Sequence, residues 1–317
     1  IRSCCTLLSK YWIRFFNRNI NFQTMAFNSI SIDLGATSGR VVLAVLENGK
    51  LTLEEIHRFS NGFSTIAGRT YCNIYYLFDE IRKGLKKVGA KNIKIDSIGV
   101  DTWGVDIVCI GKDGHILSQP RAYRDHYTDG MMDEYFKIVP KDEVYNRTGI
   151  QFMNFNTLFQ LFTLKREGNS SLEAADKILF LPDAFSFLLT GKMVCEYTIL
   201  STSQFLNPFK KAIDTELLEA AGINPDIIPE VVMPGHIVGQ LTPELARETG
   251  LGPVNVIAVA GHDTGSAVAA VPTTTKNFAY LSSGTWSLIG VESESPIIGE
   301  ESFKENYTNE GGIDGTT

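Results

Sequence analysis

Short runs of apolar, mostly β-branched residues alternate along this chain with turns rich in glycine and hydroxyl side chains. Near the start, this pattern predicts a meander of three strands over residues 29–32, 41–45 and 51–56. Asn48-Gly49 is a typical two-residue hairpin turn between the last two strands. Apolar residues at helical spacing over 77–88 predict a helix that covers one face of this sheet.

Later segments continue the alternation of strands and helices. We expect strands over 93–101 and 105–110, and mainly helices with aromatic-rich loops over 127–250. One helix is expected to begin at Leu181-Pro182-Asp183, with proline in its first turn, and to end at Thr190-Gly191. The order of the elements predicts an α/β fold.

One carboxylate stands where a strand is expected to turn into a helix. Residues 254–260 form an almost wholly apolar run that predicts a strand buried on both faces, and small residues over 263–270 predict a helix that ends before Pro272. Ligands of open α/β sheets bind at the ends of strands, so Asp263 is well placed to act as a general base. The alternative is that Asp263 only caps the helix N-terminus.

Two segments share one plan, in which two strands flank a turn of glycine and hydroxyl residues. The first turn covers residues 33–40, and the second covers 282–287 between expected strands at 278–281 and 288–291. Backbone N–H groups freed by glycine, together with Thr and Ser hydroxyls, suit a polyphosphate. The Gly-Lys-Ser/Thr ending of a P-loop is absent. The repeat predicts a duplicated fold that grips a polyphosphate from two sides, and plain hairpin turns are the alternative.

An indole beside a glycine marks a candidate sugar site. Trp103-Gly104 lies between Asp101 and Asp106, and a sugar offers both C–H faces and hydroxyls to such a set. The alternative is a core tryptophan with two aspartates at loop ends. Tyr123-Arg124-Asp125 is a second candidate, either a polar clamp or an exposed ion pair. The apolar connection at 148–156 is expected to line a pocket or to pack beneath a lid.

Composition and charge restrict the class of protein. With 44% hydrophobic and 21% charged residues, the chain has the composition of a soluble globular protein, and no apolar run is as long as a membrane span. A net charge of −7 argues against binding to nucleic acid through phosphates. Residues 1–24 contain basic but no acidic side chains, and we interpret them as extraneous or upstream sequence before Met25; a mitochondrial-type presequence is the alternative.

Five cysteines are spaced without a metal-ligand pattern. Cys4 and Cys5 fall in the basic segment and carry no information on redox compartment. Cys72, Cys109 and Cys195 are isolated in apolar or aromatic surroundings and are interpreted as reduced core residues of a cytoplasmic protein.

The motifs taken in order resemble those of the FGGY carbohydrate kinases, members of the actin-like ATPase superfamily. The resemblance runs from about residue 29 to the last residue. It is carried first by residues 33–40, 261–264 and 282–286. Four intervening segments narrow it to the branch of the family that acts on L-rhamnulose: 101–106, 123–125, 149–152 and 189–193.

This resemblance implies transfer of the γ-phosphoryl group of Mg-ATP to the C1 hydroxyl of L-rhamnulose. Asp263 would accept the proton of that hydroxyl, and Gly104, His262 and Thr264 would line the sugar. Asp33 would be the carboxylate near Mg²⁺, through water. The phosphates would be held by Ala36, Thr37, Ser38, Gly39, Arg40 and Thr285. ATP and Mg²⁺ are thus the implied cofactors, and neither nucleic acid nor membrane is an expected partner.

The resemblance also implies a ribonuclease H-like, actin-like fold of two lobes with a nucleotide cleft between them. Residues 25–271 would be the N-terminal domain, and 277–317 the start of a C-terminal domain that is truncated, so the chain as given is expected to be inactive. The adenine pocket and part of the sugar site would lie beyond Thr317. The competing interpretations are a kinase for another ketose or polyol, such as xylulose or fuculose, and a non-catalytic sugar or nucleotide sensor.

Overall fold

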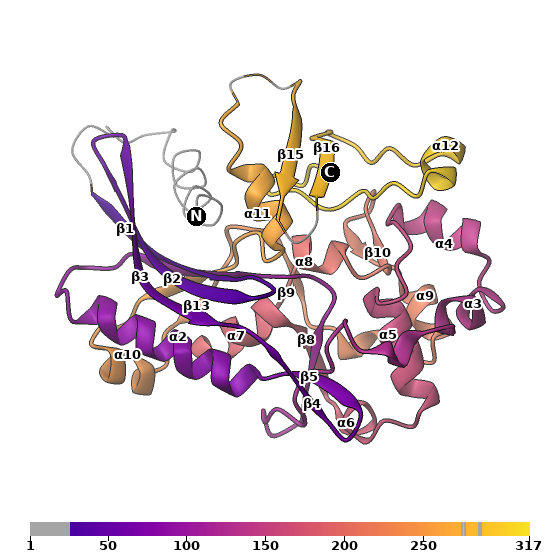
Figure 1. Ribbon diagram of the computed structural model, residues 1–317, viewed down its shortest axis with the longest axis horizontal. Coiled ribbons are helices and arrows are strands. Elements are labelled where there is room, and N and C mark those ends of the chain that lie inside the picture. The colour runs from indigo at the N-terminus through magenta and orange to yellow at the C-terminus, as the bar shows by residue number, and fades with distance from the viewer. Residues whose placement is uncertain (1–25, 274, 276, 285–286) are drawn as a thin grey trace.

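The computed structural model describes residues 26–273, 275, 277–284 and 287–317 (Figure 1). The basic segment 1–24, with Cys4 and Cys5, lies outside the described residues, and so does Thr285 of the second hydroxyl turn. Within the described residues, helices and strands alternate along the chain and the predicted α/β class is confirmed.

Six strands form the central sheet in the order β13-β14-β6-β1-β2-β3. Their bounds are β1 Phe27–Leu34, β2 Ser38–Glu47, β3 Lys50–Ser60, β6 Ser97–Thr102, β13 Ile237–Gln240 and β14 Asn255–Ile257. The strands β14, β6 and β1 are parallel to one another, whereas β13, β2 and β3 are antiparallel to their neighbours. The predicted meander is therefore confirmed as β1, β2 and β3, and the carboxyl ends of three parallel strands meet at one edge of the sheet.

Three of the predicted strands are shorter than expected. The strand expected over 105–110 covers only Ile107–Ile110. Ahead of β6, the Asp96 side chain accepts from Asn28 N of β1 at 2.9 Å, and regular pairing begins only at Ser97. The run 254–260 pairs regularly only over Asn255–Ile257, because the β13–β14 register shifts between Ile237 and Gly239. Its apolar residues are nonetheless buried, as predicted.

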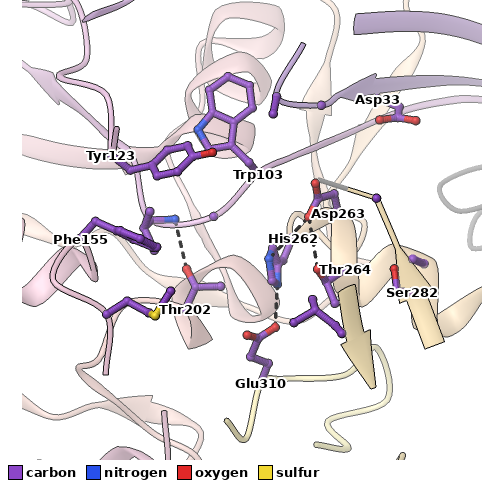
Figure 2. Close-up of a pocket in the computed structure, with 18 of the residues that line it drawn as sticks. Asp33, Trp103, Tyr123, Phe155, Thr202, His262, Asp263, Thr264, Ser282 and Glu310 are labelled. Carbon is purple, nitrogen blue, oxygen red and sulfur yellow. Dashed lines mark hydrogen bonds and ion pairs between the residues drawn. The ribbon is translucent and has the colours of Figure 1, made fainter. Parts of the chain in front are cut away.

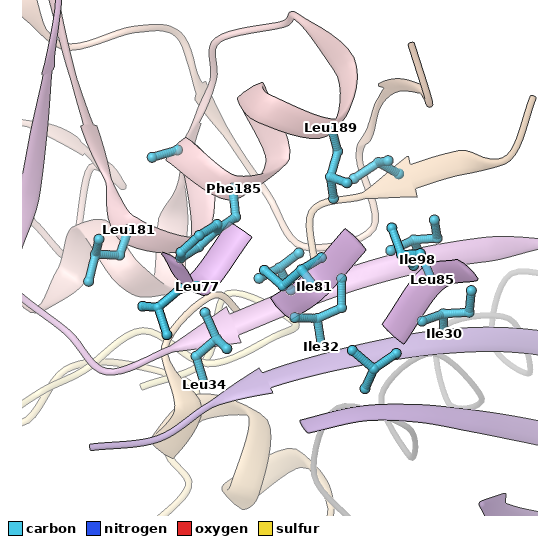
Figure 3. Packing of buried hydrophobic residues seen from close by; sticks show 14 of the residues in the cluster. Ile30, Ile32, Leu34, Leu77, Ile81, Leu85, Ile98, Leu181, Phe185 and Leu189 are labelled. Carbon is cyan, nitrogen blue, oxygen red and sulfur yellow. The ribbon is translucent and has the colours of Figure 1, made fainter. Parts of the chain in front are cut away.

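One face of the sheet packs on helices α2 (Ile74–Gly89), α7 (Leu181–Thr190) and α10 (Pro243–Thr249). On β1 every second residue is apolar, so Ile30, Ile32 and Leu34 point to the same side of the sheet. Figure 3 shows these side chains against those of α2 and α7. The predicted helices at 77–88 and 181–190 are both confirmed.

A second, largely helical part follows and encloses a separate apolar core. It is built mainly from short helices with aromatic side chains between them, as expected for residues 127–250. Its elements, with the small strands that border it, are β4 Phe63–Ile66, β5 Arg69–Cys72, β7 Ile107–Ile110, η2 His126–Thr128, α3 Met131–Phe136, α4 Lys141–Thr148, α5 Thr157–Arg166, α6 Ser170–Ala174, β8 Lys177–Phe180, β9 Cys195–Glu196, α8 Tyr197–Ser201, β10 Leu206–Asn207, β11 Ala212–Ile213, α9 Thr215–Ala220, η3 Pro225–Ile227 and β12 Val231–Val232.

The last part of the chain begins with α11 (Asp263–Ala269) and the predicted hairpin of β15 (Ala279–Ser283) and β16 (Ser287–Val291). Among the described residues these two strands pair only with each other. After β16 the chain returns to the helical part through α12 (Glu300–Lys304) (Figure 1). There, Phe303 packs on the rings of Tyr145 and Phe152.

The described cysteines agree with their interpretation as core residues. Cys72, Cys109 and Cys195 are buried and free. None of the helices in the described ranges is both long enough and apolar enough to cross a membrane.

Candidate active site

A cavity of about 530 Å³ opens where the parallel strands β1, β6 and β14 end. Asp33 comes from the end of β1, Trp103 and Gly104 follow β6, and Asp263 begins the helix after β14. The chain reverses at these strand ends, and side chains that are far apart in sequence therefore share one space (Figure 2).

Nine of the residues singled out in the sequence line this cavity. They are Asp33, Ala36, Thr37, Ser38, Arg40, Gly104, His262, Asp263 and Thr264. The second hydroxyl turn also reaches it, through Ser282, Ser283 and Gly284. The two turns that share a plan in the sequence thus face the same cavity.

Gly39 is the exception among the described candidates, because the cavity lining does not include it. A Cβ built at this position would lie 2.3 Å from the ring of Phe59 and 2.7 Å from Leu34. Glycine is needed here for close packing beneath the turn. The structure therefore shows a packing role for Gly39 outside the cavity lining, and its place beside the phosphates stays a prediction.

Asp263 is the first residue of α11 and projects into the cavity. The N-cap is His262, whose side chain makes no capping bond, so the interpretation of Asp263 as the helix cap is wrong. The Asp263 side chain is 40% exposed to solvent. Desolvation raises the pKa of its carboxyl; His262 acts in the opposite direction, and Asp33 adds a smaller upward effect. A carboxylate with a raised pKa is a stronger base than an ordinary aspartate.

His262 lies between two carboxylates. Its Nδ1 is 3.1 Å from Oε2 of Glu310, and its Nε2 is 3.6 Å from Oδ1 of Asp263. Burial disfavours the charged ring, but the negative charges of Glu310, Asp263 and Glu196 outweigh it and raise the pKa of His262 to about 9. The imidazolium form is thus favoured at neutral pH. Glu310 was missed in the sequence, because nothing near residue 310 marks it as a neighbour of residue 262.

The first hydroxyl turn has a rigid frame with free side chains. Its backbone is closed by Gly35 N donating to Ser38 O at 3.0 Å, and Asn61 Nδ2 donates to Gly35 O at 2.7 Å. Within the described residues, the hydroxyls of Thr37 and Ser38 make no hydrogen bond, although both residues line the cavity. These hydroxyls are available to a ligand.

Arg40 and Asp33 form an ion pair at the edge of the same turn, with Nη2 and Oδ2 2.8 Å apart. Both side chains are largely covered, with 21% and 17% exposure. The turn therefore presents a guanidinium and a carboxylate side by side, the former suited to phosphate and the latter to a cation.

Aromatic and apolar side chains form the opposite wall, with Trp103, Tyr123, Met153 and Phe155 among the lining residues (Figure 2). The expectation that residues 148–156 line a pocket is confirmed by Ile150, Gln151, Met153, Phe155 and Asn156. Trp103 is 6% exposed, so it belongs to the core and to the cavity wall at once.

The aspartates that flank Trp103 lie beneath this wall. Asp106 is buried and accepts from Trp103 Nε1 at 2.9 Å, and desolvation raises the pKa of Asp106 to about 7. Asp101 is also buried and outside the cavity lining. Asp106 thus orients the indole, and of the two alternatives for these aspartates the structure favours a core tryptophan with aspartates beneath it.

Of the second candidate set, only Tyr123 reaches the cavity. Asp125 instead accepts from the backbone N–H of Tyr127 and pairs with Arg121 at 3.1 Å. Arg124 donates to the hydroxyl of Tyr123 at 2.9 Å. Of the two alternatives, the structure shows an ion pair, although Asp125 pairs with Arg121 and both side chains are largely covered rather than exposed.

The turn after Trp103 has a strained backbone that the sequence did not reveal. Val105 has φ of 68°, which is unfavourable for a β-branched residue. Its N–H donates to Thr202 Oγ1 at 3.3 Å, and its carbonyl accepts from Thr157 Oγ1 at 2.8 Å. The surrounding hydroxyls thus hold Gly104 and Val105 at the cavity edge, which is typical of functional sites.

The chain was compared with known proteins. Residues 29–270 match the model of the N-terminal domain of the FGGY family of carbohydrate kinases. Rhamnulokinase of Bacteroides thetaiotaomicron is 54% identical over 292 residues, which are 92% of this chain and 60% of that protein. Rhamnulokinase of Bacillus subtilis is 43% identical over 286 residues, which are 90% of this chain and 58% of that protein. The chain thus spans about three-fifths of the length of these curated relatives.

Solved structures agree on the fold. A ligand-bound xylulose kinase from Lactobacillus acidophilus superimposes with a TM-score of 0.78 at 20% identity, over 87% of this chain and 56% of that one. Plasmodium falciparum glycerol kinase with ADP gives a TM-score of 0.73 at 16% identity, over 87% and 56%. The expected actin-like fold of sugar kinases is confirmed for this part of the chain.

Proposed function

This chain belongs to the FGGY family of carbohydrate kinases, and from that premise we propose that it binds the sugar and the phosphates in an ATP-dependent kinase that phosphorylates L-rhamnulose at its C1 hydroxyl. The observation that carries the proposal is the meeting of Asp263, the hydroxyl turn at residues 35–38 and an aromatic wall in one cavity. A general base, a phosphate cradle and a sugar surface are what phosphoryl transfer to a sugar requires.

In the proposed reaction, the sugar lies on the wall that contains Trp103, with its acceptor hydroxyl directed at Asp263. The carboxylate of Asp263 takes the hydroxyl proton as the sugar oxygen bonds to the γ-phosphorus. The bond between that phosphorus and the β,γ-bridging oxygen breaks, and ADP leaves with the electron pair. Phosphoryl transfer depends mainly on positioning and charge neutralisation, so Thr37, Ser38 and Arg40 contribute by holding the phosphates.

The donor set suits a magnesium ion bound mainly through phosphates and water. Within the described residues, no three His, Cys, Asp or Glu side chains come together as they would in a metal cluster. Mg²⁺ commonly keeps several waters and uses one or two carboxylates, and Asp33 at the phosphate turn fits that mode. The ion would neutralise phosphate charge. Asp33 would orient the hydrated ion beside the turn, while Arg40, its ion-pair partner, holds an adjacent phosphate oxygen.

We further propose that residues 25–271 act as the N-terminal lobe and 277–317 as part of a second lobe. Thr285, which lies outside the described residues, would contact phosphates from that second lobe. We place the enzyme in the cytoplasm, in L-rhamnose catabolism.

The choice of sugar is supported by the names of the relatives and by the apolar wall. Met153, Tyr123 and Phe155 favour an acceptor with an apolar end, and L-rhamnulose is a 6-deoxy sugar. The test is ADP release by the natural full-length protein with L-rhamnulose, L-fuculose, D-xylulose and glycerol. The proposal requires the largest kcat/KM with L-rhamnulose. A larger value with another acceptor would reassign the substrate, and binding of sugar without any turnover would favour a sensor.

A further inference from the structure

Glu310 reaches the cavity from a segment distant in sequence from the other lining residues. Its Oε2 faces Nδ1 of His262 at 3.1 Å, and its Oε1 accepts from Thr308 Oγ1 at 3.4 Å (Figure 2). The charged side chain is thus aimed at the histidine ring.

The backbone on both sides of Glu310 is anchored to the helical part. Asn309 donates to Gly149 O from both its N–H and its Nδ2, each at 2.9 Å, and Gly311 N donates to Ser201 Oγ at 2.8 Å. A Cβ on Gly311 would lie 2.6 Å from the Tyr197 ring, so glycine lets the segment approach this closely. These anchors place the Glu310 carboxylate independently of any ligand.

The backbone of His262 is also anchored, on the side of α8. Its backbone N–H donates to Thr198 Oγ1 at 3.3 Å, and its side chain is only 12% exposed. With Nδ1 turned to Glu310, Nε2 lies on the side of Asp263 and the cavity. A carboxylate at Nδ1 keeps a proton on that nitrogen, so Nε2 is a donor when the ring is protonated and an acceptor when the ring is neutral.

We propose that Glu310 is a positioning residue that fixes the orientation and the proton of His262, so that Nε2–H is a permanent hydrogen-bond donor to the sugar beside Asp263. This inference rests on the proposed function for the identity of the ligand. Without the Glu310 carboxylate, Nδ1 loses its acceptor, and the neutral ring can carry its proton on either nitrogen.

The charged groups that face His262 are Glu310, Asp263 and Glu196, with Asp33 beyond Asp263. Burial of the ring opposes protonation, and the three nearest carboxylates raise the pKa of His262 to about 9. Reciprocally, His262 lowers the pKa of Glu310 against the effect of desolvation. Glu310 is the largest of the raising influences, so its removal favours the neutral ring at physiological pH.

The decisive experiment reads the protonation of His262 directly, by ¹H–¹⁵N NMR of the imidazole nitrogens in the natural full-length protein labelled at histidine. His262→Gln assigns the signal. In the unaltered protein, both nitrogens of His262 are expected to stay protonated through pH 8, whereas Glu310→Gln lowers the midpoint by at least one pH unit. Glu310→Asp, which keeps the charge, should restore part of the shift, and Glu305→Gln, on an exposed carboxylate nearby, should change nothing.

A kinetic measurement separates positioning from folding. Glu310→Gln is expected to raise KM for the sugar at least tenfold at pH 8 while KM for ATP stays within twofold, with the Tm of each variant recorded. An unchanged NMR midpoint in Glu310→Gln would overturn the proposal, as would equal losses in both KM values. If Glu310→Gln does not fold, Glu310→Ala, which also removes the charge, decides by the same two readouts. The NMR titration does not require turnover. If the protein showed no kinase activity but Glu310→Gln still lowered the midpoint of His262, that result would count against the proposed function alone.

Discussion

The side-chain carboxylate of Glu196 accepts a hydrogen bond from the backbone N–H of Gly261 at 2.9 Å. The same carboxylate caps α8 by accepting from the N–H groups of Thr198 and Ile199 at 2.8 and 3.0 Å. A Cβ on Gly261 would lie 2.9 Å from this carboxylate, so glycine is needed for the approach. A buried acid thus fixes the backbone immediately ahead of His262 and Asp263.

We expect Glu196→Gln to loosen this junction. The amide places an N–H₂ group among backbone donors, and at least one of the bonds to Thr198, Ile199 or Gly261 is lost. Breaking such a bond in a buried site costs about 1–3 kcal/mol, and the free energy of unfolding from urea denaturation should fall by that amount.

Glu230→Gln is the matched control, because Glu230 lies near β9 but is exposed. It should stay within about 0.5 kcal/mol of the unaltered protein. Equal stability of the two variants would show that the Glu196 contacts do not hold the junction.

The pattern of apolar and polar residues predicted a helix or strand correctly where one face of that element is buried and the other is not. Ile30, Ile32 and Leu34 alternate with polar residues, and that alternation is sufficient for a half-buried strand such as β1. The end of α7 could also be predicted from the sequence, because glycine is favoured at a helix C-cap with positive φ, and Gly191 adopts φ of 75° there. The length of β14 could not, because its pairing depends on a register shift in β13, which the sequence of β14 does not contain.

Some residues of the candidate site could likewise be predicted from the local sequence, and others could not. Asp263 and Thr37 could be found because a turn or strand end near each of them marks the position. Glu310 and Glu196 could not, since their roles arise from contacts with residues 262 and 261, distant along the chain. The packing role of Gly39 was missed for a related reason, because only the structure brings Phe59 against it.

The packing role of Gly39 leads to a stability prediction. Gly39→Ala would place a methyl group 2.3 Å from the Phe59 ring, and overpacking of this kind costs about 1–3 kcal/mol. Thermal unfolding should show a lower Tm for Gly39→Ala. Adding Phe59→Leu should recover part of the loss, because a smaller side chain relieves the clash. No recovery in the double variant would mean that the ring is not the obstacle.

Thr37→Val tests the phosphate turn. Valine keeps the shape of threonine but removes the hydroxyl, and a lost hydrogen bond to a charged group is worth about 1.5–3 kcal/mol. Binding of ATP, measured by calorimetry on the natural full-length protein, should weaken by about tenfold to a hundredfold. Sugar binding without nucleotide should be unchanged. A matching loss for the sugar would make the turn a structural element, and Ser38→Ala should repeat the expected pattern.

The pH dependence of turnover follows from the raised pKa of Asp263. Desolvation shifts this pKa above the ordinary value of 3.8. A general base must be ionised, so kcat/KM should rise with pH through an inflection above 3.8 and should be lost as the carboxyl is protonated. The profile is measured from pH 3 to 8 at saturating ATP. Thr37→Val, which leaves Asp263 untouched, should keep the same inflection, and an inflection at or below 3.8 would contradict the shift.

Replacing Asp263 by asparagine removes the proposed base with little change in shape. We expect kcat of the natural full-length protein to fall by about 10²–10⁴, the contribution typical of general base catalysis, while the sugar affinity stays within about tenfold. The helix should not be weakened, because its N-cap is His262 and the Asp263 side chain does not cap it. Tm and sugar binding are therefore measured beside ADP release, with the exposed Asp226→Asn as control. Retention of most of the unaltered kcat by Asp263→Asn would remove Asp263 from the chemistry and leave the cavity as a binding site alone.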